Sequence, residues 1–240
     1  MTGVLFFLGV ALVLVGSCAL VVAIRRHMSL EISWYGLVVM GFGAAVAAYV
    51  AMMGAGLVYA MVALPDALPR AALARRLDII LINTLLLALL LEGFKSYAIQ
   101  IFDTSMTRGN WTLYGFAVGL GAGICQAFWL LGAQSWAIIA GLEVVQSRDL
   151  WLVGRTGALV AMEASLGALL MYWTARNHRA EAISGVGALH GLALMAPAIL
   201  ILTPAFSDAG TWIGIAANLT AAAGAALALG WQVKRRGWPT

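Results

Sequence analysis

Apolar residues fill this chain in long runs that are separated by short polar stretches. The runs cover about residues 3–24, 33–63, 79–102, 112–140, 152–175, 182–204 and 211–232. A helix rises about 1.5 Å per residue, so roughly 20 apolar residues cross the hydrocarbon core of a bilayer. Because each run is long enough, the pattern predicts an all-α, polytopic membrane helix bundle with about seven transmembrane helices.

The second run, residues 32–64, is longer than a helix perpendicular to the bilayer requires. A helix of this length must tilt, kink or project from the membrane. Pro65, Pro69 and the charged residues 70–78 then form the longest polar connection of the chain.

The amino-acid composition also indicates a membrane protein. The chain of 240 residues is 63% hydrophobic and 10% charged, against roughly 45–50% and about 25% in soluble domains. The apolar excess extends over the whole length, so we expect a single transmembrane domain, residues 1–240, with no sizeable soluble part. We therefore expect an integral, multi-pass protein with membrane lipid as one of its partners.

Lysine and arginine in short loops set the orientation of a membrane protein. With the N-terminus outside, eight basic loop residues lie on the cytoplasmic side. Four lie on the outer side: Arg70, Arg75, Arg76 and Arg148. This distribution predicts an N-out, C-in topology.

Few polar residues interrupt the apolar runs, and each needs a partner because an ionisable group at the centre of a membrane helix costs roughly 2.5–3.5 kcal/mol. The third run contains Glu92 and Lys95, the fifth Glu163 and the sixth His190. Gln126 in the fourth run is a neutral addition. We expect these five residues to form the polar core of the bundle.

Two interpretations are open for this core. Glu92 and Lys95 are three residues apart and can neutralise each other on one helix face, or they can face the bundle interior and meet His190 or Glu163. Glu163 lies about three turns into its run, so it is either protonated or paired, for example with His190. Arg155 lies near the start of the same run, where its side chain can extend to the membrane surface.

The fourth run contains Gly115, Gly119 and Gly123, a GxxxGxxxG pattern. Glycine at every fourth position leaves a flat face on which another helix can approach to backbone contact. The facing helix belongs either to this chain or to a partner, and the three glycines are our candidate helix-docking residues.

Several chemistries are excluded. No clustered basic face indicates nucleic-acid binding, and Cys18 and Cys125 both lie within apolar runs, which argues against a disulfide framework or a metal site. HExxH, paired-Cys and P-loop motifs do not occur, and no run contains a pair of aspartates. We therefore expect no metal, no cofactor and no nucleic-acid partner.

In their order, these residues resemble one superfamily. It contains the prenyl-protein (CAAX) processing proteases, the PrsW- and YhfC-type bacterial membrane proteases, and the anterior-pharynx-defective scaffold subunit of γ-secretase. The protease members carry a Glu-Glu-x-x-Arg type motif followed by histidines on two later helices. The resemblance implies that the first Glu and the histidines activate water for peptide hydrolysis. Here the corresponding stretch begins with Leu91 and Glu92 and ends with Lys95.

Leu91 therefore stands at the position of the first acid, and a leucine cannot act as a general base. The scaffold subunit has the same loss, together with a GxxxGxxxG pattern on its fourth span and one histidine on each of its fifth and sixth spans. His190 matches the second histidine, whereas Glu163 and Ala164 stand near the first. The resemblance thus implies a pseudoprotease scaffold whose glycine face docks a transmembrane partner such as a presenilin-like protease.

Two other functions remain as alternatives. The first is an atypical glutamic-type intramembrane protease, with Glu92 or Glu163 as the base and His190 assisting. The second is a proton or small-solute carrier that uses the same acids, which would need a continuous polar path. A dry polar cluster would favour the scaffold, and a wet cleft open to one side would favour the enzyme.

Overall fold

The structure of the chain is a computed structural model that describes residues 2–27, 34–63, 77–101, 110–201 and 209–237. These residues form seven helices and no strand. The helices are α1 (Thr2–His27), α2 (Trp34–Ala63), α4 (Leu77–Gln100), α5 (Trp111–Ile139), α6 (Ser147–Thr174), α7 (Arg179–Ile201) and α8 (Ala209–Arg236). Each expected apolar run corresponds to one helix. Most of the connection predicted at residues 65–78 lies outside the described residues.

Six of the described helices, all except α7, contain a segment long and apolar enough to cross a membrane. By length and composition the chain is therefore a multi-pass helical membrane protein. Cys18 and Cys125 are both free thiols.

Two helices, α6 and α7, begin in polar sequence ahead of the apolar run that predicts them. The apolar pattern predicts a helix from about residue 152, but α6 begins at Ser147. The backbone N–H of Gln146 donates a hydrogen bond to Asp149 Oδ2 at 2.7 Å, so this acid caps the helix start. Similarly, α7 begins at Arg179, with the acidic residue Glu181 in its first turn, where a negative charge is favourable.

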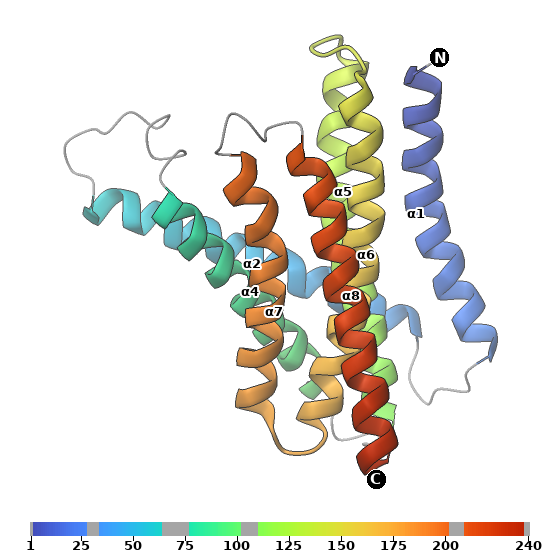
Figure 1. Cartoon of the computed structure of the whole chain (residues 1–240), viewed down its shortest axis with the longest axis vertical. Coiled ribbons are helices and arrows are strands. Elements are labelled where there is room, and N and C mark those ends of the chain that lie inside the picture. Colours follow the sequence, from blue (N-terminus) through green and yellow to red (C-terminus); the bar gives the residue numbers. More distant parts are fainter. Residues whose placement is uncertain (1, 28–33, 64–76, 102–109, 202–208, 238–240) are drawn as a thin grey trace.

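The centre of the bundle is the pair α5 and α6. Their apolar segments are 61% and 78% buried, against 6% for α1, so α1 lies at the periphery. Figure 1 shows α5, α6, α7 and α8 along the long axis, whereas α2 and α4 cross it obliquely. The oblique course of α2 agrees with the tilt expected for a run of this length. The start of α1 and the end of α8 lie at opposite ends of the bundle.

The glycines of α5 allow two helices to reach its backbone. A Cβ atom on Gly119 would collide with the carbonyl group of Glu163 on α6, and one on Gly123 would lie 2.8 Å from Val160 Cα. On another face of α5, a Cβ on Gly121 would collide with the backbone of Val38 on α2. Close backbone approach of this kind is how membrane helices associate when lipid is as apolar as their side chains.

These contacts show which helix covers the glycine face among the described residues. The face formed by Gly115, Gly119 and Gly123 does receive a helix, but that helix is α6 of the same chain. Backbone atoms of α6 occupy the space that a partner helix would need. The glycine face is therefore an internal packing surface of this fold.

A pair of alanine substitutions on α5 tests this packing. Gly119→Ala should lower the free energy of unfolding by about 1–3 kcal/mol, because the added methyl group overpacks the contact with α6. Gly132→Ala on the same helix should not destabilise, since no atom lies within 4 Å of the new Cβ and alanine favours the helix. Thermal unfolding of both variants in one detergent makes the comparison. Equal melting temperatures would contradict the packing described.

Candidate functional site

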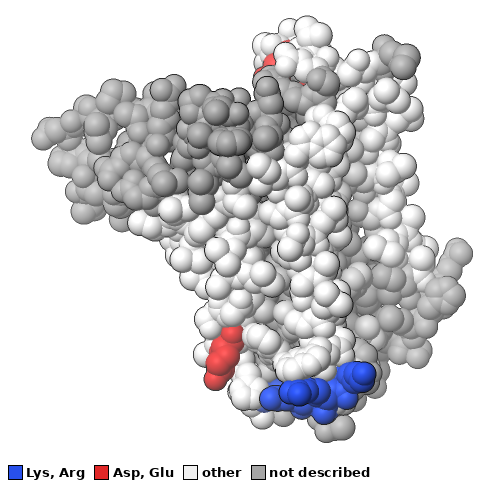
Figure 2. Space-filling view, in the orientation of Figure 1, with Lys and Arg blue, Asp and Glu red and all other residues white. Residues whose placement is uncertain are grey.

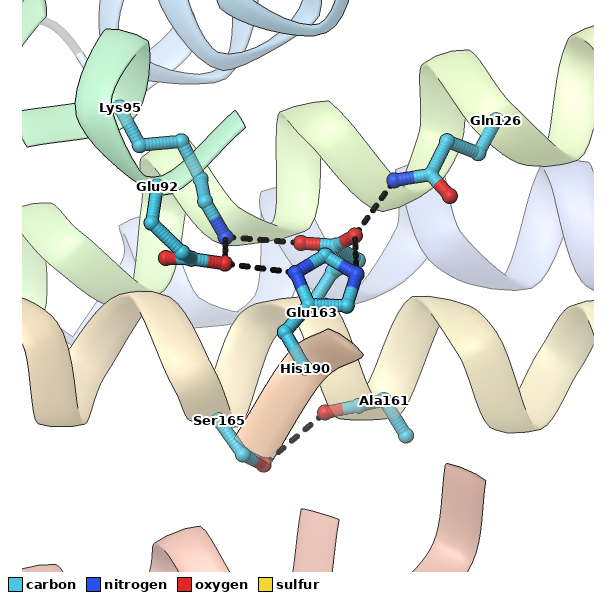
Figure 3. Close-up of polar contacts among 7 residues, drawn as sticks. All are labelled: Glu92, Lys95, Gln126, Ala161, Glu163, Ser165 and His190. Carbon is cyan, nitrogen blue, oxygen red and sulfur yellow. Dashed lines mark hydrogen bonds and ion pairs between the residues drawn. The ribbon is translucent and has the colours of Figure 1, made fainter. Parts of the chain in front are cut away.

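Five polar side chains meet at the centre of the bundle and form what we call the ion network (Figure 3). Glu92 and Lys95 come from α4, Gln126 from α5, Glu163 from α6 and His190 from α7. Four consecutive helices, α4 to α7, thus contribute to a single site. The structure brings together all five residues that the sequence singled out as a polar core.

Lys95 is the hub of the ion network. Its Nζ lies 2.6 Å from Glu92 Oε1 on the same helix and 2.8 Å from Glu163 Oε2 on α6, and both contacts are hydrogen-bonded ion pairs. The two interpretations of the Glu92–Lys95 pair are therefore realised together: the pair forms within α4, and it also faces inward and reaches α6.

His190 lies between the same two acids. Its Nδ1 is 2.8 Å from Glu92 Oε1, and its Nε2 is 3.1 Å from Glu163 Oε1. With both carboxylates ionised and Lys95 charged, the network has one negative charge in excess, which a proton on His190 would balance. Ionised carboxylates only accept hydrogen bonds, so a ring with both nitrogens protonated suits this position.

Gln126 completes the coordination of Glu163 by donating a hydrogen bond from Nε2 to Oε1. Gln126 follows Gly123 by three residues and so lies on the same side of α5. The close approach of α5 to α6 at the glycines is what brings this amide within reach of Glu163. Both carboxylate oxygens of Glu163 are thereby engaged.

The ion network is buried. Glu92, Lys95, Glu163 and His190 are each 0% exposed, and Gln126 is 3% exposed. Five cavities of about 210–460 Å³ lie along the described residues, and no member of the network lines any of these five. The largest is lined by apolar and aromatic side chains of α4, including Leu90 and Tyr97.

Two atoms of the network remain without a hydrogen bond among the described residues, Glu92 Oε2 and His190 Nε2, and both are buried. For Nε2 the nearby Glu163 oxygen still supplies an electrostatic partner. Glu92 Oε2 is the one carboxylate oxygen of the network with no donor in the described part of the chain.

Three members offer atoms that a metal ion could use. Ligand atoms of Glu92, Glu163 and His190 all lie within 4.8 Å of one another. The ammonium of Lys95, however, is bonded to both carboxylates and occupies the position of the cation. A metal ion would have to displace Lys95, and the residues present therefore fit an internal lysine better than a metal.

The remaining residues considered from the sequence lie outside the ion network. Arg155 is half-buried on α6. The hydroxyl of Ser165 donates to the carbonyl of Ala161 at 2.9 Å and points away from Glu163 (Figure 3). Leu91 is 1% exposed and packs in an apolar cluster with Ala45, Ala48, Ala122 and Cys125.

Sequence reasoning missed two parts of the structure. Gly167 on α6 faces Gly115, and Gly41 on α2 faces Val118, so the flat surfaces are matched by glycines on the helices that cover them. A signal for Gly167 exists: it follows Glu163 by four residues and so shares its helix face. Arg176 also binds the end of α8, which no local pattern indicates.

The stability of the bundle should depend on Lys95. Lys95→Met leaves two carboxylates buried without their cation, and loss of one partner of a buried ion pair costs about 3–5 kcal/mol. The exposed Lys234 on α8 provides the control, because Lys234→Met should change the free energy of unfolding by less than about 0.5 kcal/mol. Denaturant unfolding in detergent measures both. If Lys95→Met unfolded like the wild type, the ammonium would not bridge the two acids.

The chain matches no protein-family model, no curated protein sequence and no solved structure. The resemblance to the CAAX-protease and γ-secretase-subunit superfamily therefore depends on the motif residues alone, from Leu91 to His190.

Proposed function

We propose that this chain is a non-catalytic membrane scaffold, similar in kind to the γ-secretase assembly subunit, in which the ion network fixes the packing of four helices. One observation carries the proposal: the fully buried ammonium of Lys95 binds both acids of the network, Glu92 and Glu163. Acids that are bound by a buried ammonium have a structural role.

The surroundings of these acids do not suit a catalytic role. A general base needs a carboxylate within hydrogen-bond reach of a water or substrate proton. Both oxygens of Glu163 have donors, and Glu92 Oε1 is shared by Lys95 and His190. The position that the resemblance assigns to the principal base is Leu91, whose surroundings are apolar.

The topology that goes with this proposal has seven spans, with the N-terminus outside and the C-terminus in the cytoplasm. The distribution of Lys and Arg supports the orientation. A chain that starts at one end of the bundle and finishes at the other must cross an odd number of times. The six apolar helices and α7 together give seven crossings, which is an odd number.

A scaffold needs a partner, which we take to be another transmembrane protein, presenilin-like or of another class. Since α6 covers the glycine face, the partner would contact the lipid-facing surface of the bundle. That surface has several exposed large apolar side chains, such as Leu12 on α1, Met53 on α2 and Leu227 on α8.

The second candidate is an atypical glutamic-type intramembrane protease, and one observation favours it. Glu92 Oε2 is buried and has no hydrogen-bond donor among the described residues, while the other oxygen of the same carboxylate contacts His190. A water molecule bound at Oε2 would give the Glu–His arrangement that such an enzyme uses.

Cleavage assays separate the two candidates. In proteoliposomes containing a panel of single-span substrates, the scaffold proposal expects the wild type to produce no more cleavage than Glu92→Gln does. Ser165→Ala is the matched control, because Ser165 lies on the same helix as Glu163 but its hydroxyl points away from the network. Cleavage by the wild type and Ser165→Ala that is lost in folded Glu92→Gln and His190→Ala would establish the protease instead.

Assembly provides the positive arm of the test. Extracted from its native membrane in a mild detergent, a scaffold should run as a discrete complex with one other transmembrane protein in fixed proportion. Mass photometry combined with protein identification measures this. A homogeneous monomer under conditions that preserve other membrane complexes would contradict the scaffold.

A further inference from the structure

A basic cavity lies where α6 turns into α7, beside the end of α8. It has a volume of about 210 Å³, and its walls include Arg176, Arg236, Trp173 and Gln232. Figure 2 shows the lysines and arginines of this face gathered at the same end of the bundle, while the described surface above them has little charge. The cavity is thus the place where positive charge and a concave surface coincide.

Arg176 is held rigidly in this wall. Its Nη2 donates to the carbonyl oxygens of Arg236 at 2.8 Å and Gly237 at 2.7 Å, and its guanidinium lies 5.1 Å from the centre of the Tyr172 ring. The hydroxyl of Tyr172 donates to the same Gly237 carbonyl at 3.1 Å. A cation fixed in advance loses little conformational entropy when it binds an anion.

Arg176 also retains unused binding capacity. Its Nε is buried and makes no hydrogen bond among the described residues, so an anion in the cavity would bind the outer N–H groups of the guanidinium. A guanidinium has five N–H donors, and the two carbonyls both use Nη2. An anion with several oxygen atoms would match the remaining donors, and phosphate is one group that arginine recognises by this geometry.

The acid nearby does not cancel the positive charge. Glu181 also lines the cavity, but its side chain is 70% exposed, and its oxygen lies 3.9 Å from His178 Nδ1. An exposed pair at this distance is weak. Beyond the cavity, Lys234 and Arg235 add two further cations in the last turn of α8.

The aromatic residues around this cavity are of the kind found at the level of lipid headgroups. Trp173 lines the cavity, and Trp231, which is 52% exposed, has the guanidinium of Arg235 4.4 Å from its ring centre. Tryptophan and arginine together mark the boundary between hydrocarbon and water. The phosphates of the surrounding lipid lie at this boundary.

We propose that the cavity between the α6–α7 turn and the end of α8 is a binding site for the phosphate of an anionic phospholipid headgroup, with Arg176 and Arg236 as its cationic walls. The site is independent of the ion network and of the choice between scaffold and protease. It gives the leaflet that this end of the bundle faces a specific lipid contact next to the packing of α6 against α8.

Native mass spectrometry of the full chain in a neutral detergent tests the proposal with phosphatidylglycerol as the probe and phosphatidylcholine as its zwitterionic counterpart. We expect retention of phosphatidylglycerol over phosphatidylcholine, and a loss of affinity of about tenfold in Arg236→Gln, as for one charge-assisted hydrogen bond. The matched control is Lys234→Gln, which removes the same charge from the same turn outside the cavity and should change affinity less than twofold.

Arg236→Gln is chosen because Arg176 binds the backbone carbonyl of Arg236, which the substitution keeps; an unchanged melting temperature verifies the fold. Equal losses in Arg236→Gln and Lys234→Gln would reduce the effect to general surface charge and overturn the proposal. Equal retention of both lipids would overturn it as well. Full displacement of phosphatidylglycerol by millimolar inorganic phosphate would assign the cavity to free phosphate instead of lipid.

Discussion

The bundle depends on one buried cation that is shared between two acids. Lys95 joins α4 to α6 because its ammonium lies within 2.8 Å of carboxylate oxygens on both helices, and His190 and Gln126 attach α7 and α5 to the same acids. Lipid tails are as apolar as these helices, so burial of apolar surface gives no preference for one packing over another. A polar network whose ion pairs form in only one register supplies that preference.

Backbone packing and the ion network meet at one residue. The carbonyl of Glu163 lies against Gly119, while its carboxylate binds Lys95, His190 and Gln126. Any displacement of α6 from α5 therefore also moves the acid on which the network is built. This coupling explains why the glycine face and the polar core, which the sequence presents as separate features, act as one structural unit. It also explains why α6 is the most buried helix among the candidate spans.

The elements and the members of the network could be predicted because each follows from a strong local cost. Seven apolar runs have no other stable form in a membrane, and an ionisable residue far from the end of a run must find a partner. The pairings could not be predicted, since Lys95 satisfies Glu92 within its own helix as readily as it reaches Glu163. Nor does a run of glycines show which helix covers it, because a glycine such as Gly119 is equally suited to a contact within the chain and to a contact with a partner. The early start of α6 was missed because a polar first turn looks like a loop until Asp149 is seen to cap it.

The comparison between a scaffold and a protease reduces to the surroundings of two neighbouring positions on α4. Glu92 faces the network, whereas Leu91 is packed against alanines of α2 and α5. A carboxylate at position 91 would be buried in this cluster without a donor, a cost of several kcal/mol, unless α2 and α5 also changed. The leucine at position 91 is thus part of the packing of three helices. Close packing around position 91 thus excludes a base there. Among the described residues, Glu92 and Glu163 are paired with Lys95 and His190. The two acids are therefore part of the framework that holds the helices together.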